Sequence, residues 1–286
     1  MEIIEKLVPS FNERNGQKPI IIVNHISVGS MGSMYNTFAN KNNKASSHFG
    51  VGRDGTIVQY VPINKSAWTQ GKIQLPTAPI IKQIGGDPNK YGVSIEHEGY
   101  AGNGLDGNLT GEQFLATCWI HKHIQTAVEA EYGVRIPLNS HQVLGHYQID
   151  SKGKPFCPGL AFPWGRLYAE LAIADTMTLE QYEERITYNS SQAADRTIAY
   201  AFAERIQDLK SKFADPRWGV PAKSKVMMMA PVIYQMGYAE DKEVTPEGIA
   251  QRVLELHNNS AIEKYRDSGF KKLLIGAKRA KEVGLL

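Results

Sequence analysis

The sequence predicts an α/β domain, with a mixed central β-sheet flanked by helices, followed by a smaller all-helical domain. Up to about residue 172, short β-branched runs alternate with helical patterns and include one hairpin signal. Beyond that point the strand-like alternation disappears and capped helical stripes replace it. We therefore predict one domain over residues 1–172 and a second over 173–286.

Length and composition agree with two soluble domains. Single domains most often have about 100–150 residues, so 286 residues are enough for two cores. The net charge of +3 is too small to indicate binding to nucleic acid. No apolar run approaches the roughly 20 residues that cross a bilayer. We therefore expect neither a nucleic-acid partner nor a membrane span.

The first strong strand signal is the run Ile20–His25. It is long enough for a buried strand and too short for a buried helix. The alternation of side chains along a strand places Ile21, Val23 and His25 on one face. Residues 1–18, before it, read as a short helix or an extended arm.

A β-hairpin is predicted over Ser47–Pro62, because Asp54-Gly55 carries a turn signal between two strand-like runs. A short helix over Met34–Asn40 precedes it. Residues 69–90 are rich in Gly, Pro and Gln and read as a surface loop, the kind of segment that commonly carries binding residues.

The next strand is Tyr91–Glu98. If Val93 and Ile95 face the core, Glu96 and Glu98 face the opposite side. These two carboxylates would lie about 7 Å apart by strand rise. Such a pair on one face indicates that one of them faces a cation.

A helix is predicted over Gly111–Tyr132. Thr110 and Gln113 have the spacing of a capping box, and Gly133 supplies the C-terminal stop. A last helix, Phe162–Leu171, closes the first domain.

The second domain reads as capped helices. Thr178–Gln181 opens one, and an apolar stripe over residues 198–213 marks another that ends at Asp215-Pro216. Thr245–Glu247 and Ser260–Glu263 begin two more.

Three distant residues form a candidate metal site: His25, His146 and Cys157. Two imidazoles and a thiolate suit Zn²⁺ with a fourth position left to water. No short spacing joins the three, however, and a single histidine is more often a hydrogen-bonded structural residue. The other cysteine, Cys118, lies on the apolar stripe of a predicted helix and reads as an inert core thiol.

From about residue 18 to 170 the chain resembles the zinc-dependent N-acetylmuramoyl-L-alanine amidases of the peptidoglycan-recognition-protein type, found in phage endolysins and Bacillus-type autolysins. Six blocks carry the resemblance in the family's order: Ile22–Ser27, Ser47–Pro62, Ala67–Trp68, Val93–Gly99, Gly145–His146 and Cys157–Gly159.

The resemblance implies that His25, His146 and Cys157 hold zinc. Cys157 would then be a thiolate ligand, unavailable as a nucleophile. Glu96 aligns with the family's general base, which shuttles the proton of the attacking water to the leaving amine. Glu98 is the alternative, but a hydrogen bond to a loop or to a metal ligand suits it better.

The chain departs from the family at two places. Ser47 stands where a tyrosine usually precedes His48, and Pro155 stands where many relatives carry a lysine that stabilises the oxyanion. Either Lys154 or His48 could supply that donor, and the sequence leaves both open. We count Ser47 and Trp68 with Glu98 as candidate substrate-binding residues, although Trp68 could equally cap a core.

The resemblance implies a peptidoglycan-lytic endolysin that cuts the amide between N-acetylmuramic acid and L-alanine. One alternative is a non-catalytic peptidoglycan-recognition module, and another is an intracellular amidase that recycles soluble muropeptides. The N-terminal segment lacks the basic start and apolar core of a signal peptide. We therefore expect a host-cytoplasmic protein that reaches the cell wall on lysis, or an extracellular one if it is an autolysin.

The helical domain is predicted to bind the wall. Residues 264–286 hold seven Lys or Arg against two acids, which would favour anionic polymers such as teichoic acid. A solvated helix face explains the same charges.

Overall fold

The computed structural model describes residues 1–99, 106–260 and 266–286, without the side chains of 188–193, 266 and 267. The chain divides into two compact units, Met1–Ile186 and Thr187–Leu286. The first unit extends past residue 172 because Ala174, Tyr182 and Ile186 are buried in its core. The predicted division at 172 stays a prediction.

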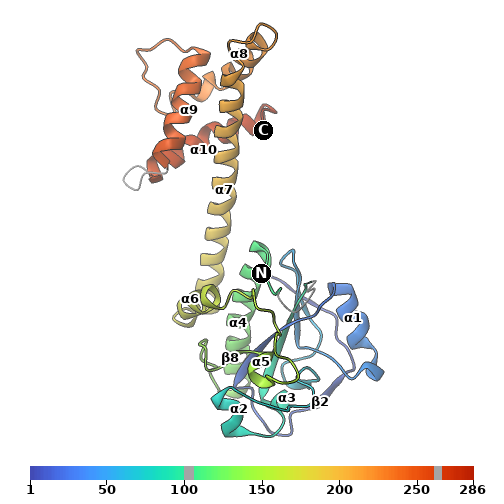
Figure 1. The fold of residues 1–286 in the computed structure, drawn as a ribbon. Helices are drawn as coiled ribbons and strands as arrows, with labels where there is room; N and C mark the ends of the chain where they lie inside the picture. The colour runs from blue at the N-terminus through green and yellow to red at the C-terminus, as the bar shows by residue number, and fades with distance from the viewer. Residues whose placement is uncertain (100–105, 261–265) are drawn as a thin grey trace. The chain divides into compact units, whose positions relative to one another are not determined.

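The first unit is built on a mixed six-stranded sheet (Figure 1). Its strands, in spatial order, are β1 (Ile3–Glu5), β5 (Ile57–Gln59), β4 (Phe49–Val51), β7 (Gly92–His97), β3 (Ile21–Ile26) and β8 (Val143–Gly145). All neighbours run parallel except the β4–β5 hairpin. The mixed sheet and its hairpin confirm the predicted fold class.

The N-terminal arm is extended. β1 adds to the edge of the sheet, and β2 (Phe11–Glu13) pairs antiparallel with β6 (Lys65–Ala67) in a separate ribbon. The helical alternative for residues 1–18 is therefore wrong.

Helices cover both faces of the sheet. One face carries α4 (Gly111–Tyr132) and α6 (Trp164–Asp175) over a core that includes Ile22, Val93 and Ile95. The other carries α1 (Met31–Ala39) with the 3₁₀ turn η1 (Lys41–Asn43), α2 (Pro79–Ile84), α3 (Pro88–Tyr91) and α5 (His146–Ile149). Since side chains alternate along strands, His25 and Glu96 lie on this second face, opposite α4.

Helix ends follow the signals in the sequence where capping groups are present. Thr110 Oγ1 accepts the Gln113 N–H at 3.0 Å, and Gly133 ends α4 with φ +64°. The prediction of a loop over 69–90 missed two short helices, α2 and α3. Pro79 and Pro88 each occupy the first helical position of one of them.

The second unit is helical. Its helices are α7 (Leu179–Ser211, which begins in the first unit), α8 (Gly219–Met227), the 3₁₀ turn η2 (Ala230–Val232), α9 (Pro246–Ser260) and α10 (Arg266–Glu282). The core includes Phe202, Ile206 and Leu273. The two helices predicted from Thr178 to residue 213 are one continuous helix. The predicted start at Ser260–Glu263 falls mainly outside the described residues.

Within the described ranges, no helix combines the length and the apolar character that a bilayer span requires.

Candidate functional site

The site lies at the carboxyl ends of three parallel neighbours, β7, β3 and β8. His25 stands near the end of β3, and His146 directly follows β8. The loop after α5 returns Cys157 to them, because the Tyr147 N–H donates to the Cys157 carbonyl at 2.9 Å. Ligands commonly bind at this edge of a sheet, where the loops that follow neighbouring strands converge.

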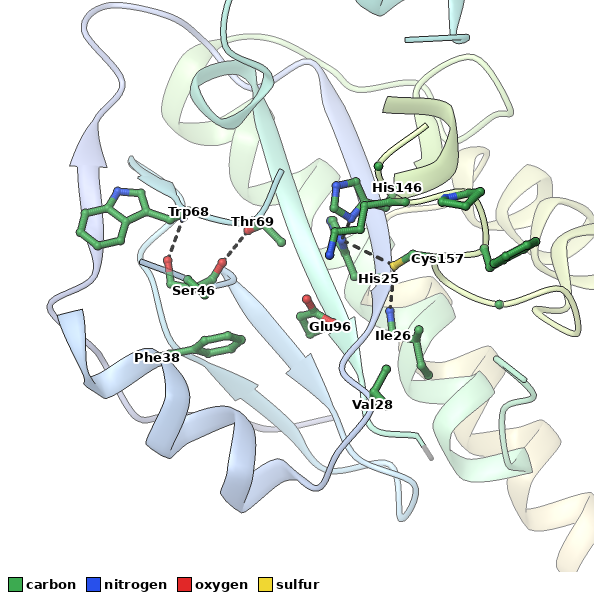
Figure 2. Close-up of a pocket in the computed structure, with 16 residues that line it drawn as sticks. His25, Ile26, Val28, Phe38, Ser46, Trp68, Thr69, Glu96, His146 and Cys157 are labelled. Atoms are coloured by element: carbon green, nitrogen blue, oxygen red, sulfur yellow. Dashed lines mark hydrogen bonds between the residues drawn. The ribbon is translucent and has the colours of Figure 1, made fainter. Parts of the chain in front are cut away.

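The three predicted ligands converge (Figure 2). Nδ1 of His25 lies 3.0 Å from Nδ1 of His146 and 4.0 Å from Sγ of Cys157. All three donor atoms lie within 4.8 Å of one another. Tetrahedral zinc, with bonds of about 2.0–2.3 Å, holds its nitrogen and sulfur ligands about 3–4 Å apart. The donor set and its spacing therefore fit a zinc ion.

The protonation of the ligands also suits a cation. Burial, reinforced by the neighbouring histidines, holds the pKa of His25 well below its usual value, and burial lowers the pKa of His146 to about 4. Both imidazoles are therefore neutral at pH 7. Burial and Glu96 raise the pKa of the Cys157 thiol to about 12. A thiolate at this position therefore requires a neighbouring positive charge, which a bound metal ion supplies.

Gln70 contacts both histidines on their outer sides and was missed in the sequence. Its main-chain carbonyl accepts the Nε2–H of His146 at 3.1 Å, which leaves Nδ1 of His146 free to ligate. Its side-chain amide nitrogen lies 3.4 Å from Nε2 of His25, and its buried Oε1 has no partner. The only sequence signal was the Gln-rich stretch read as a surface loop, yet Gln70 is buried.

Glu96 lies beside the three candidate metal ligands. It is the register partner of His25 across β3 and β7, and its buried Oε2 has no hydrogen-bond partner. Burial raises the pKa of Glu96 to about 8, against the opposing charge of Lys154. A carboxylate that titrates near neutral pH can both accept and return a proton.

A cavity of about 420 Å³ connects these groups. The predicted residues that line it are His25, Trp68, Glu96, His146, Lys154 and Cys157. Apolar side chains join them, with Val28 and Phe156 strongly exposed and Phe38 buried. In Figure 2, Glu96 lies between Cys157 and Phe38, and Trp68 lies at the end away from Cys157. The sequence did not single out Val28, Phe38 or Phe156.

His48 does not line this cavity. It is buried, its Nδ1 accepts the Ser94 N–H at 3.0 Å, and its Nε2 lies 3.0 Å from both the Lys65 carbonyl and Arg14 Nη2. Burial and the Arg14 charge lower its pKa to about 3. The alternative in which His48 stabilises an oxyanion has no geometric support, because its ring nitrogens face the core.

Ser47 and Glu98 also lie outside the cavity lining. Ser47 Oγ lies 3.0 Å from the carbonyls of Phe49 and Ser94. The Glu98 carboxylate accepts the N–H groups of Met31 at 3.2 Å and Arg53 at 2.9 Å, which ties α1 to the hairpin turn. These contacts match the loop-supporting role considered for Glu98 and give Ser47 no route to a substrate.

Comparisons with known proteins give one family match and several similar solved structures. A search of curated proteins finds no match. A solved AmpD derivative is 23% identical over 59% of this chain and 94% of its own, with a TM-score of 0.44. The PlyL structure is 22% identical over 61% and 97%, with a TM-score of 0.42. The amidase LysC from Clostridium intestinale is 17% identical over 60% and 98%, with a TM-score of 0.39.

The family model for N-acetylmuramoyl-L-alanine amidase matches residues 15–160, just over half of the chain. This segment contains all three converging ligands, Glu96 and the cavity that joins them. The chain therefore belongs to the N-acetylmuramoyl-L-alanine amidase family, the enzymes that hydrolyse the amide between N-acetylmuramic acid and L-alanine in peptidoglycan.

Proposed function

We propose that this amidase depends on zinc and lyses cell walls. The observation that carries the zinc is the convergence of His25, His146 and Cys157, all with donor atoms within 4.8 Å. A bound zinc ion would lower the pKa of a water toward about 7 and polarise the scissile carbonyl. Proton transfer and stabilisation of the oxyanion then depend on side chains of the protein.

Glu96 is proposed as the proton shuttle. Its side chain lines a cavity shared with the candidate ligands, and its Oε2 has no hydrogen-bond partner, so the carboxylate can take a proton from the attacking water. The same carboxyl group can then protonate the leaving amine of alanine, because its pKa lies close to neutral pH. A cation bound nearby favours the ionised form and shifts this pKa downward.

Lys154 is proposed to stabilise the oxyanion. It is exposed at the cavity wall, on the same loop as Cys157, and among the described residues it is the one lysine that lines the cavity. An ammonium group there favours the negative oxygen that develops on the carbonyl. Trp68 supplies an aromatic wall for the substrate.

The test combines metal content with product analysis. Purified protein should contain about one zinc per chain, clear Gram-positive walls and release new N-terminal alanine. Release of reducing sugars without alanine would assign a glycosidase instead. Cys157→Ser should lose both metal and activity, while Cys118→Ser, which changes a buried cysteine of the α4 core, provides the matched control.

The two alternatives predict different outcomes. A recognition module would bind walls and release no alanine. A recycling amidase would cut soluble muropeptides but leave intact walls unchanged. Clearing of walls with release of alanine contradicts both alternatives.

We further propose that the second unit retains the enzyme on the wall, which makes the wall its site of action. The sequence offered the basic residues of α10, such as Lys271, Lys278 and Lys281, for contact with anionic polymers. Their charges support attraction but do not form a site.

A further inference from the structure

A second cavity, of about 340 Å³, lies within the helical unit. Its walls come from the last turns of α7, the connection to α8 and α8 itself (Figure 1). Leu209 and Ala222 form a buried apolar floor, and Trp218 stands at its edge.

Trp218 is unusually open for its size. Its side chain is 57% exposed, and within the described part of the chain the indole makes no aromatic-ring or cation–π contact. The backbone of Trp218 is nevertheless fixed, because its N–H donates to Asp215 Oδ1 at 3.3 Å and its carbonyl accepts the Ala222 N–H at 2.8 Å. The indole is therefore an uncovered ring on a fixed stretch of backbone, which suits stacking against a ligand.

Three cations and no carboxylate line this cleft. Asp208, outside the lining, pairs with Arg205 at 2.9 Å and with Lys212 at 2.8 Å and so holds both in place. Lys225 has no ion-pair partner among the described residues. The three lining cations have a single carboxylate partner between them, Asp208, so these four residues together carry an excess of two positive charges.

An aromatic ring beside cations that outnumber their acidic partners favours an anion with apolar C–H faces. Phosphate pairs with Arg and Lys, and a sugar or polyol can lie on the indole. A neutral glycan would instead need amide or carboxylate partners, and the lining described here offers none. The amidase acts at the wall, where phosphate-linked polyol polymers surround its substrate.

We propose that the cleft at Trp218 binds a phosphate-bearing polyol or sugar polymer of the cell wall. This inference rests on the proposed action on walls. It moves the wall contact from the basic face of α10 to Arg205, Lys212, Trp218 and Lys225.

The experiment measures sedimentation of the full chain with purified Gram-positive walls. A Glu96→Gln background keeps the walls intact. Trp218→Ala and Lys225→Gln should each weaken binding about tenfold, whereas Trp218→Phe and Lys225→Arg should retain most of it. Soluble poly(glycerol phosphate) should displace the protein, and walls stripped of phosphate polymers should hold much less of it.

Two control variants separate the cleft from general charge. Arg217→Gln removes an exposed cation beside the cleft but outside its lining, and Lys271→Gln removes one from α10. Both should bind within twofold of the parent. Thermal melting of every variant checks folding.

Unchanged binding of Trp218→Ala and Lys225→Gln would overturn the inference, and so would unchanged binding of the parent to stripped walls. Equal displacement by an oligonucleotide of the same charge would also overturn it and would indicate a nucleic-acid site. Release of alanine from a soluble muropeptide, measured with Glu96 intact, tests the amidase separately. Trp218→Ala should leave that rate unchanged.

Discussion

The side-chain amide of Gln70 lies 3.4 Å from Nε2 of His25. When Nδ1 of a neutral imidazole binds a metal, Nε2 carries the proton and needs an acceptor. A half-turn of the Gln70 amide places its partnerless Oε1 at this position. With its carbonyl on His146, Gln70 then fixes the tautomer of both histidine ligands.

Gln70→Ala should therefore weaken zinc binding about 10- to 100-fold. The reason is loss of the acceptor for the Nε2 proton of His25. Competition with a chelator of known affinity measures the change. Gln74→Ala, an exposed position in the same segment, is the control. Equal zinc affinity in Gln70→Ala and the parent would show that the amide does not orient His25.

Glu96→Gln should keep its zinc and lose about 100-fold or more in turnover, because an amide cannot take the proton of the attacking water. The sign of the pH dependence follows from the same group. The base must be ionised, so the rate should fall with acidification through a pKa at or below about 8. A pH–rate profile checks this, and that acid limb should be absent from the residual activity of the variant. Full turnover in Glu96→Gln would place the shuttle elsewhere.

Glu98→Gln, in contrast to Glu96→Gln, should affect stability and not turnover. Its carboxylate accepts from Met31 and Arg53 away from the cavity, so the variant should lose about 1–3 kcal/mol of unfolding free energy and keep near-normal turnover. Urea unfolding and the alanine-release assay measure the two effects. A large loss of turnover in the folded variant would contradict the structural role.

Stability should fall on acidification because buried histidines are neutral in the folded chain. Burial lowers the pKa of His121 to about 4, while an unfolded histidine titrates near 6.5. Since the unfolded state binds more protons in this window, His121 contributes stability above about pH 6.5 that is lost as pH falls toward 4. His121 contributes at most about 1.4 kcal/mol per pH unit to the change of the unfolding free energy with pH.

His121→Gln should therefore be less stable than the parent at pH 7 and show a flatter pH dependence. Urea midpoints at pH 7, 6 and 5 compare the two proteins, and contributions shared by the other histidines cancel. Parallel curves would show that His121 is not the titrating group.

Much of the catalytic face could be predicted from local patterns. The alternation of Val93 and Ile95 placed Glu96 on the correct side of β7, and Thr110 with Gly133 set both ends of α4. These succeed because strand alternation and helix capping depend on residues a few positions apart.

What the sequence could not supply depends on distant packing. Gln70 acts through a carbonyl and an amide that its loop aims at residues 45 and 76 positions away. His48 looked available for catalysis, but Ser94 and Arg14 turn its ring into the core. The local periodicity of a sequence does not reveal contacts between residues that are so far apart along the chain.

The ligands join β3 to a loop 121–132 residues later along the chain. A bound ion would therefore act as a cross-link across most of the first unit, and part of its binding energy would stabilise the fold. When zinc is scarce, the enzyme would therefore lose stability as well as activity. Proteases would then degrade it faster.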